Sequence, residues 1–437
     1  MFCVMGIYFI IKKKEGVMVS RALIIGCGGV AQVAIHKCCQ NSSVFTDICI
    51  ASRTKSKCDK VAAELQDKTT TNISTAQLDA NKVEEVVALI KSFKPDIVMH
   101  LGMPYHNLVI MDACVECKVH YLDTAGYEPE NTDDPEWRAI YEKRCKEKGF
   151  VAYFDYSWQW AYQEKFAKAG VTALCGCGFD PGVTQAYVAY AKKHEFDTID
   201  YLDILDCNGG DHGYAFATNF NPEINLREVS SPASYWEGGI FHTIPALSVH
   251  RKYNFDGVGE KDMYMLHHEE VESIVKYVPE LKKVRFFMTF GQSYIDHMNC
   301  LRDCGLLSTT PINYEGKEIV PIQFLKALLP DPASLGPRTK GKTNIGCIFR
   351  GKKDGKDKEF YIYNICDHEA SYKEVGSQAI SYTTGVPAMC GAMMLLTGKW
   401  NKPGAYTLEE FDPDPFLEQV SKFGLPYKTT TKPVLVE

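Results

Sequence analysis

The sequence predicts an α/β fold: a Rossmann-type, doubly wound parallel sheet joined to an inserted α+β domain with a mostly antiparallel sheet. Three observations support this prediction. Short apolar runs alternate with helical patterns as far as residue 175, which is typical of βαβ units. A glycine-rich turn connects the first run to the first helix. Beyond about residue 199, loops rather than helices separate most of the strand-like segments.

The first domain is expected to consist of parallel strands and intervening helices. Its strands are predicted at 22–25, 48–51, 73–78, 96–101, 119–123 and 171–175. Its helices are predicted at 30–40, 56–65, 82–92, 106–117, 156–169 and 184–193. Ligands of such sheets bind beyond the carboxyl ends of the strands, so the residues at those ends are the first candidates for a site.

The second half of the chain has a different pattern. Its strands are predicted at 201–206, 284–290, 345–349 and 360–365, with a helix at 322–329. A last helix begins near Ser381 and is rich in small and apolar residues, so we expect it to pack back on the first domain. The predicted parts are an N-terminal extension expected to be disordered, a first domain, an inserted substrate domain, a returning segment and a tail, at 1–20, 21–198, 199–376, 377–428 and 429–437.

The turn Gly26-Cys27-Gly28-Gly29-Val30-Ala31 has the pattern of a dinucleotide-binding fingerprint. Gly26 permits the tight turn, and Gly28 lets backbone N–H groups approach a pyrophosphate. Ala31 is small enough for the helix to lie close to the sheet. Gly29 and Val30 begin that helix, whose positive N-terminal end faces the anion. Residues 21–198 are therefore predicted to bind a dinucleotide.

The end of the second strand indicates which dinucleotide this is. An NAD site usually has Asp or Glu there to accept from the ribose, whereas this chain has Ser52-Arg53-Thr54, with Lys57 close behind. A guanidinium can bind the 2′-phosphate of NADPH with two hydrogen bonds. We therefore predict NADPH, and a solvated basic helix start is the alternative. Other strand ends supply further candidate cofactor-binding residues: Asp79, Ala80, Gly102, Pro104, Thr124 and Ala125.

The composition excludes several classes of protein. The 437 residues, 45% hydrophobic and 24% charged, indicate a globular protein of two or three domains. A net charge of −7 without a basic tract of useful length argues against nucleic acid. The 17 scattered cysteines indicate reduced thiols and a cytoplasmic location, and Cys114-x-x-Cys117 lacks a second pair, so no metal is predicted.

The N-terminal apolar run is too short to span a bilayer, and three lysines follow it rather than precede it. No membrane association is therefore predicted. Met18 lies three residues before the first strand, and an upstream extension of the reading frame explains residues 1–17 better than a targeting signal does.

Residues 176–184 form a second glycine-rich turn between a strand and a helix. Its backbone N–H groups could face an anionic ligand, which makes Cys177, Phe179, Asp180 and Pro181 candidate substrate-binding residues. The alternative is an ordinary turn in which Asp180 and Pro181 begin the helix. Cys177 is interpreted as a thiol lining the turn rather than as a nucleophile.

Several blocks beyond the fingerprint belong to one pattern. They lie at 156–163, 176–184, 206–213, 217–225, 288–292 and 381–388. With the fingerprint they resemble the carboxynorspermidine synthase branch of the saccharopine dehydrogenase family, from about Arg21 to Tyr427. The tryptophan-containing block at 156–163 and the stretch 206–225 are the most specific of these. Cys27 departs from the usual turn, where a smaller residue is expected.

The resemblance implies a reductive condensation on a route to spermidine-type polyamines. L-Aspartate β-semialdehyde and a diamine, either 1,3-diaminopropane or putrescine, form a Schiff base, and NADPH reduces it to carboxynorspermidine or carboxyspermidine. The resemblance also implies a homodimer. Sequence cannot choose between the two diamines, because one methylene is worth only about 1–3 kcal/mol in a pocket.

Two residues are candidates for the reacting centre. Asp123 ends a parallel strand beside the expected nicotinamide position, where a carboxylate could hydrogen-bond the developing amine or act as general acid or base. Tyr105 lies at another strand end and could orient the nicotinamide or the substrate. The alternatives are a carboxylate that caps a turn and an aromatic ring at the edge of the core.

The charged groups of the substrates also need partners. Arg227 can hold a carboxylate with two hydrogen bonds, and Asn219 and Asn221 can serve the α-amino and carboxylate groups. Asp206 and Asp211, together with Glu223, are candidates for the free ammonium of the diamine. Solvated loop or surface side chains are the alternative for each of these residues.

Two other functions remain open. A saccharopine-type reductase, which joins aminoadipate semialdehyde to glutamate, would need a second carboxylate clamp, but acidic residues outnumber the single arginine within 206–227. A catalytically inactive NADPH-binding regulator would keep the fingerprint and lose the substrate-binding blocks, which are retained here.

Overall fold

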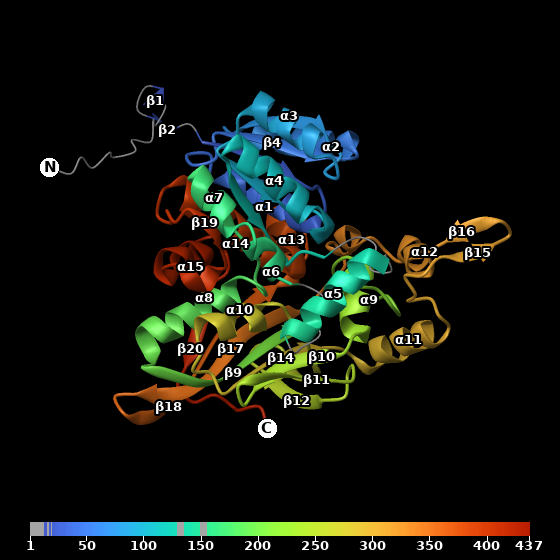
Figure 1. The fold of residues 1–437 in the computed structure, drawn as a ribbon, viewed down its shortest axis with the longest axis vertical. Helices are drawn as coiled ribbons and strands as arrows, with labels where there is room; N and C mark the ends of the chain where they lie inside the picture. The colour runs from blue at the N-terminus through green and yellow to red at the C-terminus, as the bar shows by residue number, and fades with distance from the viewer. Residues whose placement is uncertain (1–12, 15–16, 19, 129–134, 149–154) are drawn as a thin grey trace.

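The computed structural model describes residues 13–14, 17–18, 20–128, 135–148 and 155–437 (Figure 1). Two large sheets dominate these residues, one above the other in the view of Figure 1. Most of the predicted N-terminal extension lies outside the described residues. In its described residues, the short strand β1 (Lys13–Lys14) pairs with β2 (Val17–Met18).

The upper sheet is parallel and has seven strands in the order β19-β8-β7-β6-β3-β4-β5. Its strands are β3 (Arg21–Ile25), β4 (Asp47–Ser52), β5 (Asn72–Gln77), β6 (Ile97–His100), β7 (His120–Asp123), β8 (Thr172–Leu174) and β19 (Gly404–Tyr406). The predicted Rossmann-type sheet is therefore confirmed. The strand order reverses between β3 and β6, which is where such sheets bind ligands.

Helices cover both faces of this sheet because successive strand residues point to opposite sides. Ala22 and Ile24 pack towards α1 (Gly29–Gln40), α2 (Lys55–Leu65) and α14 (Ala379–Leu396), while Leu23 and Ile25 pack towards the other face. The helices of that face are α3 (Val83–Phe93), α4 (Asn107–Cys117) and α7 (Gln163–Ala169).

The returning segment completes this domain. A Cβ at Gly385 of α14 would lie 2.6 Å from Cβ of Val33, so α14 and α1 pack with little space between them. The helix is long and apolar enough to cross a membrane by length and composition, but 83% of it is buried inside the protein. It is a core helix, and β19, which follows it, adds the edge strand next to β8.

The helix predicted at 156–169 is divided in the structure. It consists of α6 (Ser157–Trp160) and α7, separated by Ala161 and Tyr162. The short α6 turns the side chain of Gln159 into the interior, where its Nε2 donates to Asp123 at 2.6 Å. Helical spacing in the sequence could not reveal this break. The helix predicted at 184–193 is α8 (Val183–Tyr190), continued by a wider turn at Ala191–Glu195.

In the described residues the lower sheet has nine strands and is mostly antiparallel, as predicted, and β9 pairs with β14 in parallel. The main path runs β11-β10-β14-β9-β17-β18-β20, and β13 joins β12 to β14. The strands are β9 (Thr198–Asn208), β10 (Ala233–Glu237), β11 (Ile240–Ile244), β12 (His250–Phe255), β13 (Gly259–Leu266), β14 (Lys283–Thr289), β17 (Lys342–Lys353), β18 (Lys356–Asp367) and β20 (Tyr427–Thr430).

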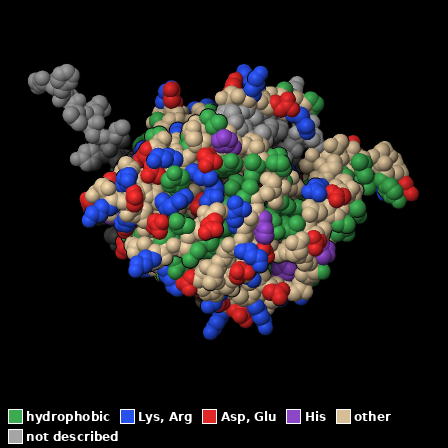
Figure 2. All heavy atoms as spheres, turned by 90° about the horizontal axis from the view of Figure 1, so that it is seen from below, with side chains coloured by type: hydrophobic (Ala, Val, Ile, Leu, Met, Phe, Trp, Pro, Cys, Tyr) green, Lys and Arg blue, Asp and Glu red, His purple; other side chains and the backbone are tan. Residues whose placement is uncertain are grey.

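The remaining helices surround the lower sheet and the space between the sheets (Figure 1). They are α5 (Pro135–Lys148), α9 (Pro222–Ser230), α10 (Glu270–Tyr277), α11 (Gln292–Asp303), α12 (Pro321–Leu328), α13 (His368–Val375) and α15 (Pro413–Lys422). The hairpin of β15 (Ile312–Tyr314) and β16 (Lys317–Ile319) projects away from the body of the molecule. On the face shown in Figure 2, basic and acidic side chains are interspersed rather than gathered into one basic surface.

Candidate active site

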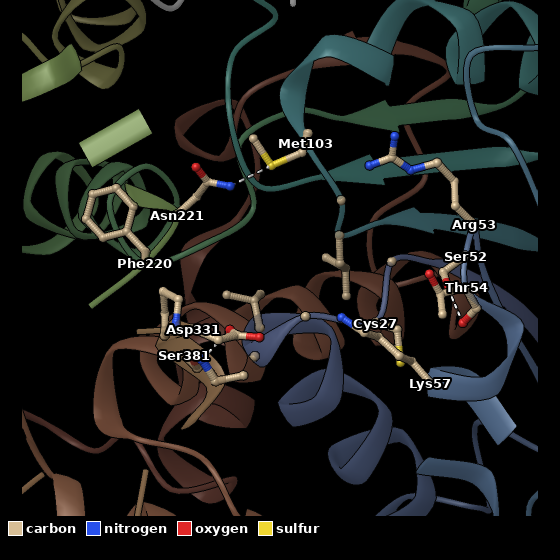
Figure 3. A pocket seen from close by; sticks show the side chains of 18 of the residues that line it. Cys27, Ser52, Arg53, Thr54, Lys57, Met103, Phe220, Asn221, Asp331 and Ser381 are labelled. Carbon is tan, nitrogen blue, oxygen red and sulfur yellow. Dashed lines mark hydrogen bonds between the residues drawn. The ribbon is translucent and has the colours of Figure 1, made fainter. Parts of the chain in front are cut away.

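A cavity of about 670 Å³ lies at the carboxyl ends of β3, β4 and β6 (Figure 3). The glycine turn and the end of β4 form one side of it. Residues 219–222, which lead into α9, and residues 326–333, at the end of α12 and beyond, form the other side. The cavity therefore occupies the point where the strand order reverses, between the upper sheet and elements of the inserted domain.

The glycine turn has the geometry that a pyrophosphate needs. Gly26 has a φ of 125°, and a Cβ there would lie 2.5 Å from the carbonyl oxygen of Leu101. A Cβ at Gly28, by contrast, would meet no atom within 4 Å, because that side of the turn faces the open cavity. The predicted Gly29 and Val30 also line the cavity, while Ala31 is buried beneath the turn. Because Gly28 has no side chain, the N-terminus of α1 faces open space, which fits a bound phosphate.

The predicted Ser52, Arg53, Thr54 and Lys57 all line the opposite end of the cavity. The hydroxyl of Ser52 donates to the carbonyl oxygen of Thr54 at 3.0 Å and holds this corner in shape. Arg53 is exposed and makes no hydrogen bond or ion pair with the described part of the chain. In Figure 3 the Arg53 side chain lies beside Ser52 and Thr54, on the side of the cavity opposite Asn221 and Phe220. A free cation at this corner suits a 2′-phosphate.

The far end of the cavity is lined by residues from β6 and from the segment before α9. The predicted Gly102, Asn219 and Asn221 lie here, and Asn221 Nδ2 is 3.3 Å from Sδ of Met103 (Figure 3). The ring of His100 bonds through Nε2 to the carbonyl oxygen of Met103 at 2.9 Å. Burial lowers the pKa of His100 to about 3, so its ring is neutral at physiological pH.

Several lining residues were not predicted from the sequence. They are His100, Met103, His106, Phe220, Pro222, Ser381 and residues of the 326–333 segment. Proximity to the end of β6 could have identified the first three. The segment after α12 carries no such signal, because only the packing of the inserted domain brings it to the cavity. Asp331 of that segment accepts from the backbone N–H of Ala333 at 3.0 Å and begins a short 3₁₀ turn.

The structure brings together two residues that the sequence could not connect, Tyr105 and Arg227. Tyr105 donates to Glu223 Oε1 at 3.0 Å, and Lys326 lies 3.1 Å from the other oxygen of Glu223. Arg227 lies one turn further along α9, contacts Tyr105 and forms a buried ion pair with Glu128. Glu223 is thus a bridge between Tyr105 and Lys326 rather than a free carboxylate, and two cations stand near the cavity rim.

Asp123 lies away from the lining of this cavity and is only 1% exposed. Its carboxylate accepts from Tyr121, Gln159 and the backbone N–H of Gly176, at 2.7, 2.6 and 2.7 Å. Burial raises its pKa to about 7. These contacts tie β7 to the second glycine turn and to α6. A structural role follows directly from them, and the proposed role of Asp123 in proton transfer stays a prediction.

The other predicted residues fall into three groups. Ala80 lines the cavity, whereas Asp79, Pro104, Thr124 and Ala125 lie beside it without lining it. Cys177, Phe179 and Pro181 are buried in the interior, and burial raises the pKa of the Cys177 thiol, which agrees with the interpretation of a thiol that is not a nucleophile.

Asp211, Asp180 and Asp206 make up the last group. Asp211 lies in an exposed loop, where its carboxylate accepts from the backbone N–H of Gly213 at 2.7 Å. Asp180 and Asp206, from the second glycine turn and from β9, are hydrogen-bonded to each other and do not line the cavity. The structure therefore separates Asp211 from the other acidic candidates.

Comparison with known proteins gives a consistent result over the whole chain. Residues 22–174 match the saccharopine dehydrogenase NADP binding domain, and residues 178–425 match the saccharopine dehydrogenase C-terminal domain. The chain is 50% identical to a carboxyaminopropylagmatine dehydrogenase of Synechocystis sp. over 93% of its own length and 97% of that protein. It is 44% identical to a carboxynorspermidine synthase of Vibrio alginolyticus, over 92% and 95% of the two chains.

A solved structure supports the same fold. The apo saccharopine dehydrogenase of Saccharomyces cerevisiae matches with a TM-score of 0.67 and 15% identity, over 94% of this chain and 100% of that one. The resemblance inferred from the sequence blocks is confirmed by these matches. The chain belongs to the saccharopine dehydrogenase family.

Proposed function

We propose that this protein catalyses the NADPH-dependent reduction of an imine formed between L-aspartate β-semialdehyde and a primary amine that carries a second cationic group. The amine is agmatine or a diamine such as putrescine or 1,3-diaminopropane. The aldehyde and the amine lose one water to give an imine, which takes up one proton to become an iminium ion, and addition of one hydride to its carbon gives a carboxylated secondary amine. The product belongs to polyamine biosynthesis.

One observation carries this proposal. Over 92–93% of its length the chain is 50% and 44% identical to a carboxyaminopropylagmatine dehydrogenase and a carboxynorspermidine synthase. The first of these names adds agmatine, which ends in a guanidinium, to the diamines that the sequence blocks implied. Agmatine and the diamines are all cations, and the acidic residues near the cavity favour cationic substrates.

The residues of the cavity fit NADPH. The open side of Gly28 and the N-terminus of α1 can receive the pyrophosphate, and Arg53 with Lys57 can hold the 2′-phosphate. The nicotinamide then reaches the end lined by Met103 and Asn221. When bound, NADPH supplies the hydride for the imine carbon.

The protein's own residues bind and orient the substrates. Arg227 and Lys326 are the cations next to the far end of the cavity, and either can attract the carboxylate of the semialdehyde. Each is held by a carboxylate partner, Glu128 or Glu223, which fixes its position before substrate arrives. Tyr105, which contacts both Glu223 and Arg227, can orient the reacting nitrogen through its hydroxyl.

The saccharopine-type alternative needs a second clamp for the carboxylates of glutamate. The two cations named above are already assigned to the carboxylate of the semialdehyde, and the other lysine and arginine among the described lining residues, Lys57 and Arg53, lie at the opposite end of the cavity. This distribution favours a cationic amine over glutamate. The inactive-regulator alternative predicts no turnover with any amine.

The test measures NADPH oxidation by the purified protein with aspartate semialdehyde and each of agmatine, putrescine, 1,3-diaminopropane and glutamate, and with aminoadipate semialdehyde and glutamate. We expect oxidation that requires both the aldehyde and one of the cationic amines, with the secondary amine identified by mass spectrometry. Oxidation with glutamate and aminoadipate semialdehyde alone would support the saccharopine-type reaction instead. No oxidation with any pair would support the regulator.

A further inference from the structure

A group of acidic side chains lies between the two sheets, outside the lining of the cofactor cavity. We call it the acidic cluster and define it as Asp180, Asp206, Glu228, Glu269 and Glu270, arranged around His268. Its members come from four segments: the second glycine turn, β9, α9 and the start of α10. Nothing in the reaction as described above uses them.

The imidazole at the centre of the cluster is held in a fixed position. Its Nδ1 pairs with Glu270, its Nε2 lies 3.6 Å from Glu228 Oε1, and its ring stacks on Phe286 with centroids 4.1 Å apart. Burial opposes its protonation, but the neighbouring carboxylates, Glu270 first, raise the pKa of His268 well above its usual value. One imidazolium therefore faces several carboxylates.

Some of these carboxylate oxygens are buried without a donor. The Glu228 side chain is 9% exposed, and its Oε1 accepts no hydrogen bond from the described residues; the same holds for Oδ1 of Asp206. Burial raises the pKa of Glu228 to about 8 and that of Asp206 to about 6. Buried carboxylate oxygens are normally hydrogen-bonded, so these two oxygens can accept from a donor that also carries positive charge.

A metal ion does not explain the cluster. Among the described residues, no group of three or more His, Cys, Asp or Glu side chains is arranged to hold one. An organic cation with several N–H donors has no such geometric requirement. Glu269 and Glu270 are fully covered, whereas Asp180, Asp206 and Glu228 keep partial exposure and so can be reached by a ligand.

Helix α9 connects the cofactor cavity to the cluster. Pro222 at its start lines the cavity, and Glu228, six residues later, belongs to the cluster. At 1.5 Å per residue the two positions are about 9 Å apart along the helix axis. Arg227, beside Glu228, stands next to Tyr105. A short alkyl chain with an amine at one end and a cation at the other can span this interval.

We propose that the acidic cluster binds the terminal cation of the amine substrate, a guanidinium or an ammonium, while its primary amine reacts beside Tyr105 and Met103. Asp206 and Glu228 supply the open acceptor oxygens, and Asp180 lies hydrogen-bonded to Asp206 behind them. His268 and Glu270 are positioning residues that fix Glu228. This inference rests on the proposed function, because it assigns the second charge of that same substrate.

The test compares amines with and without a terminal charge. Agmatine, putrescine and 1,3-diaminopropane carry one, and butylamine does not; NADPH oxidation is measured for each with aspartate semialdehyde. Glu228→Gln keeps the shape of the side chain and removes the carboxyl group that ionises when the cation binds. We expect it to raise KM for the charged amines by about tenfold or more, because a charge-assisted hydrogen bond is lost. KM for NADPH and the low rate with butylamine should stay unchanged.

The test also needs a control variant and a replacement variant. Glu280→Gln, an exposed position on the segment before β14, is the matched control and should behave as the unmodified protein. If Glu228→Gln does not fold, Asp206→Asn is used in its place. An equal change of KM for butylamine and for the charged amines, or no change for either, would overturn the proposal.

Failure of the proposed function is distinguishable from failure of this inference. Thermal unfolding of the protein with an amine alone, without aldehyde or NADPH, reports binding at the cluster directly. Stabilisation by agmatine or putrescine that Glu228→Gln abolishes would support the cluster even if no pair of substrates oxidised NADPH. Turnover with these amines but no effect of Glu228→Gln on KM or on stabilisation would leave the reaction intact and refute the cluster. The amine whose KM rises most in Glu228→Gln identifies whether the terminal group is a guanidinium or an ammonium.

Discussion

Replacing Arg53 with alanine tests the assignment of the cofactor directly. Arg53 lines the cavity at the end of β4 and makes no hydrogen bond or ion pair with the described part of the protein. Its loss therefore removes nothing that supports the fold, and the thermal unfolding temperature should not change. Any effect on the cofactor reports the contact between the guanidinium and the ligand itself.

The magnitude follows from the kind of contact and its exposure. A hydrogen bond to a charged group contributes about 1.5–3 kcal/mol, and solvent screening at an exposed site favours the lower end. We therefore expect Arg53→Ala to raise Kd for NADPH by about tenfold or more, because 1.4 kcal/mol corresponds to a factor of ten. Kd for NADH, which lacks the 2′-phosphate, should change by less than about twofold.

Fluorescence titration with both nucleotides measures these constants without any substrate. Lys55→Ala is the matched control, since Lys55 lies two residues away, pairs with Asp59 at 2.6 Å and does not line the cavity. Equal losses for NADPH and NADH would show that Arg53 does not bind the 2′-phosphate. A loss as large in the Lys55 variant would show that only the general positive charge matters.

Three further predictions concern the turn, a buried lysine and the acidic cluster. Gly28→Ala should leave thermal stability unchanged but weaken the binding of NADPH by about tenfold, since its Cβ would enter the open side of the turn. Gly26→Ala should instead lower the unfolding temperature, because Gly26 has a φ of 125°. Equal thermal stability of the two variants would contradict this prediction. Lys37→Met removes three hydrogen bonds that connect α1 to α13, α14 and the C-terminal segment. Urea unfolding should show that the free energy of unfolding falls by about 2–4 kcal/mol. A decrease below about 0.5 kcal/mol would refute a structural role for Lys37. The pKa of Glu228 is about 8 in the folded protein and about 4.5 in the unfolded chain, so the ligand-free protein should lose stability as pH rises from 4.5 to 8. In thermal unfolding, Glu228→Gln should reduce this dependence of stability on pH. An unchanged pH dependence would contradict the raised pKa of Glu228.

The parallel sheet and the cofactor end of the site could be predicted because their signals are local. Alternating apolar runs and helical patterns specify βαβ units, and the glycines at 26 and 28 follow from backbone geometry within a few residues. The same applies to Arg53, because the residue after the second strand of such a unit always lies near the ribose. These features needed no knowledge of how the inserted domain packs.

The substrate end could not be predicted, because its residues meet only through the packing of distant segments. Glu228 and His268 carry no motif, and they meet Asp206 because β9 pairs with β14 in parallel while α9 and α10 pack beside it. For the same reason Asp211, five residues after Asp206, was an equal candidate in the sequence yet lies in an exposed loop. The spacing of residues along the chain does not indicate the direction in which a loop turns after a strand ends.

The charges at the two ends of the site explain how one site can distinguish its ligands. In the proposed assignment, Arg53 and Lys57 at one end of the cavity favour a phosphorylated nucleotide, and the acidic cluster near the far end favours a cationic amine. Either ligand placed at the wrong end would meet charge of its own sign in a partly buried setting, where screening by salt is weak. Glutamate would place carboxylates towards the cluster, while Arg227 and Lys326 are already assigned to the carboxylate of the semialdehyde. The proposed electrostatics therefore discriminate against an acidic amine through repulsion as well as through missing contacts, the two routes by which binding sites achieve specificity.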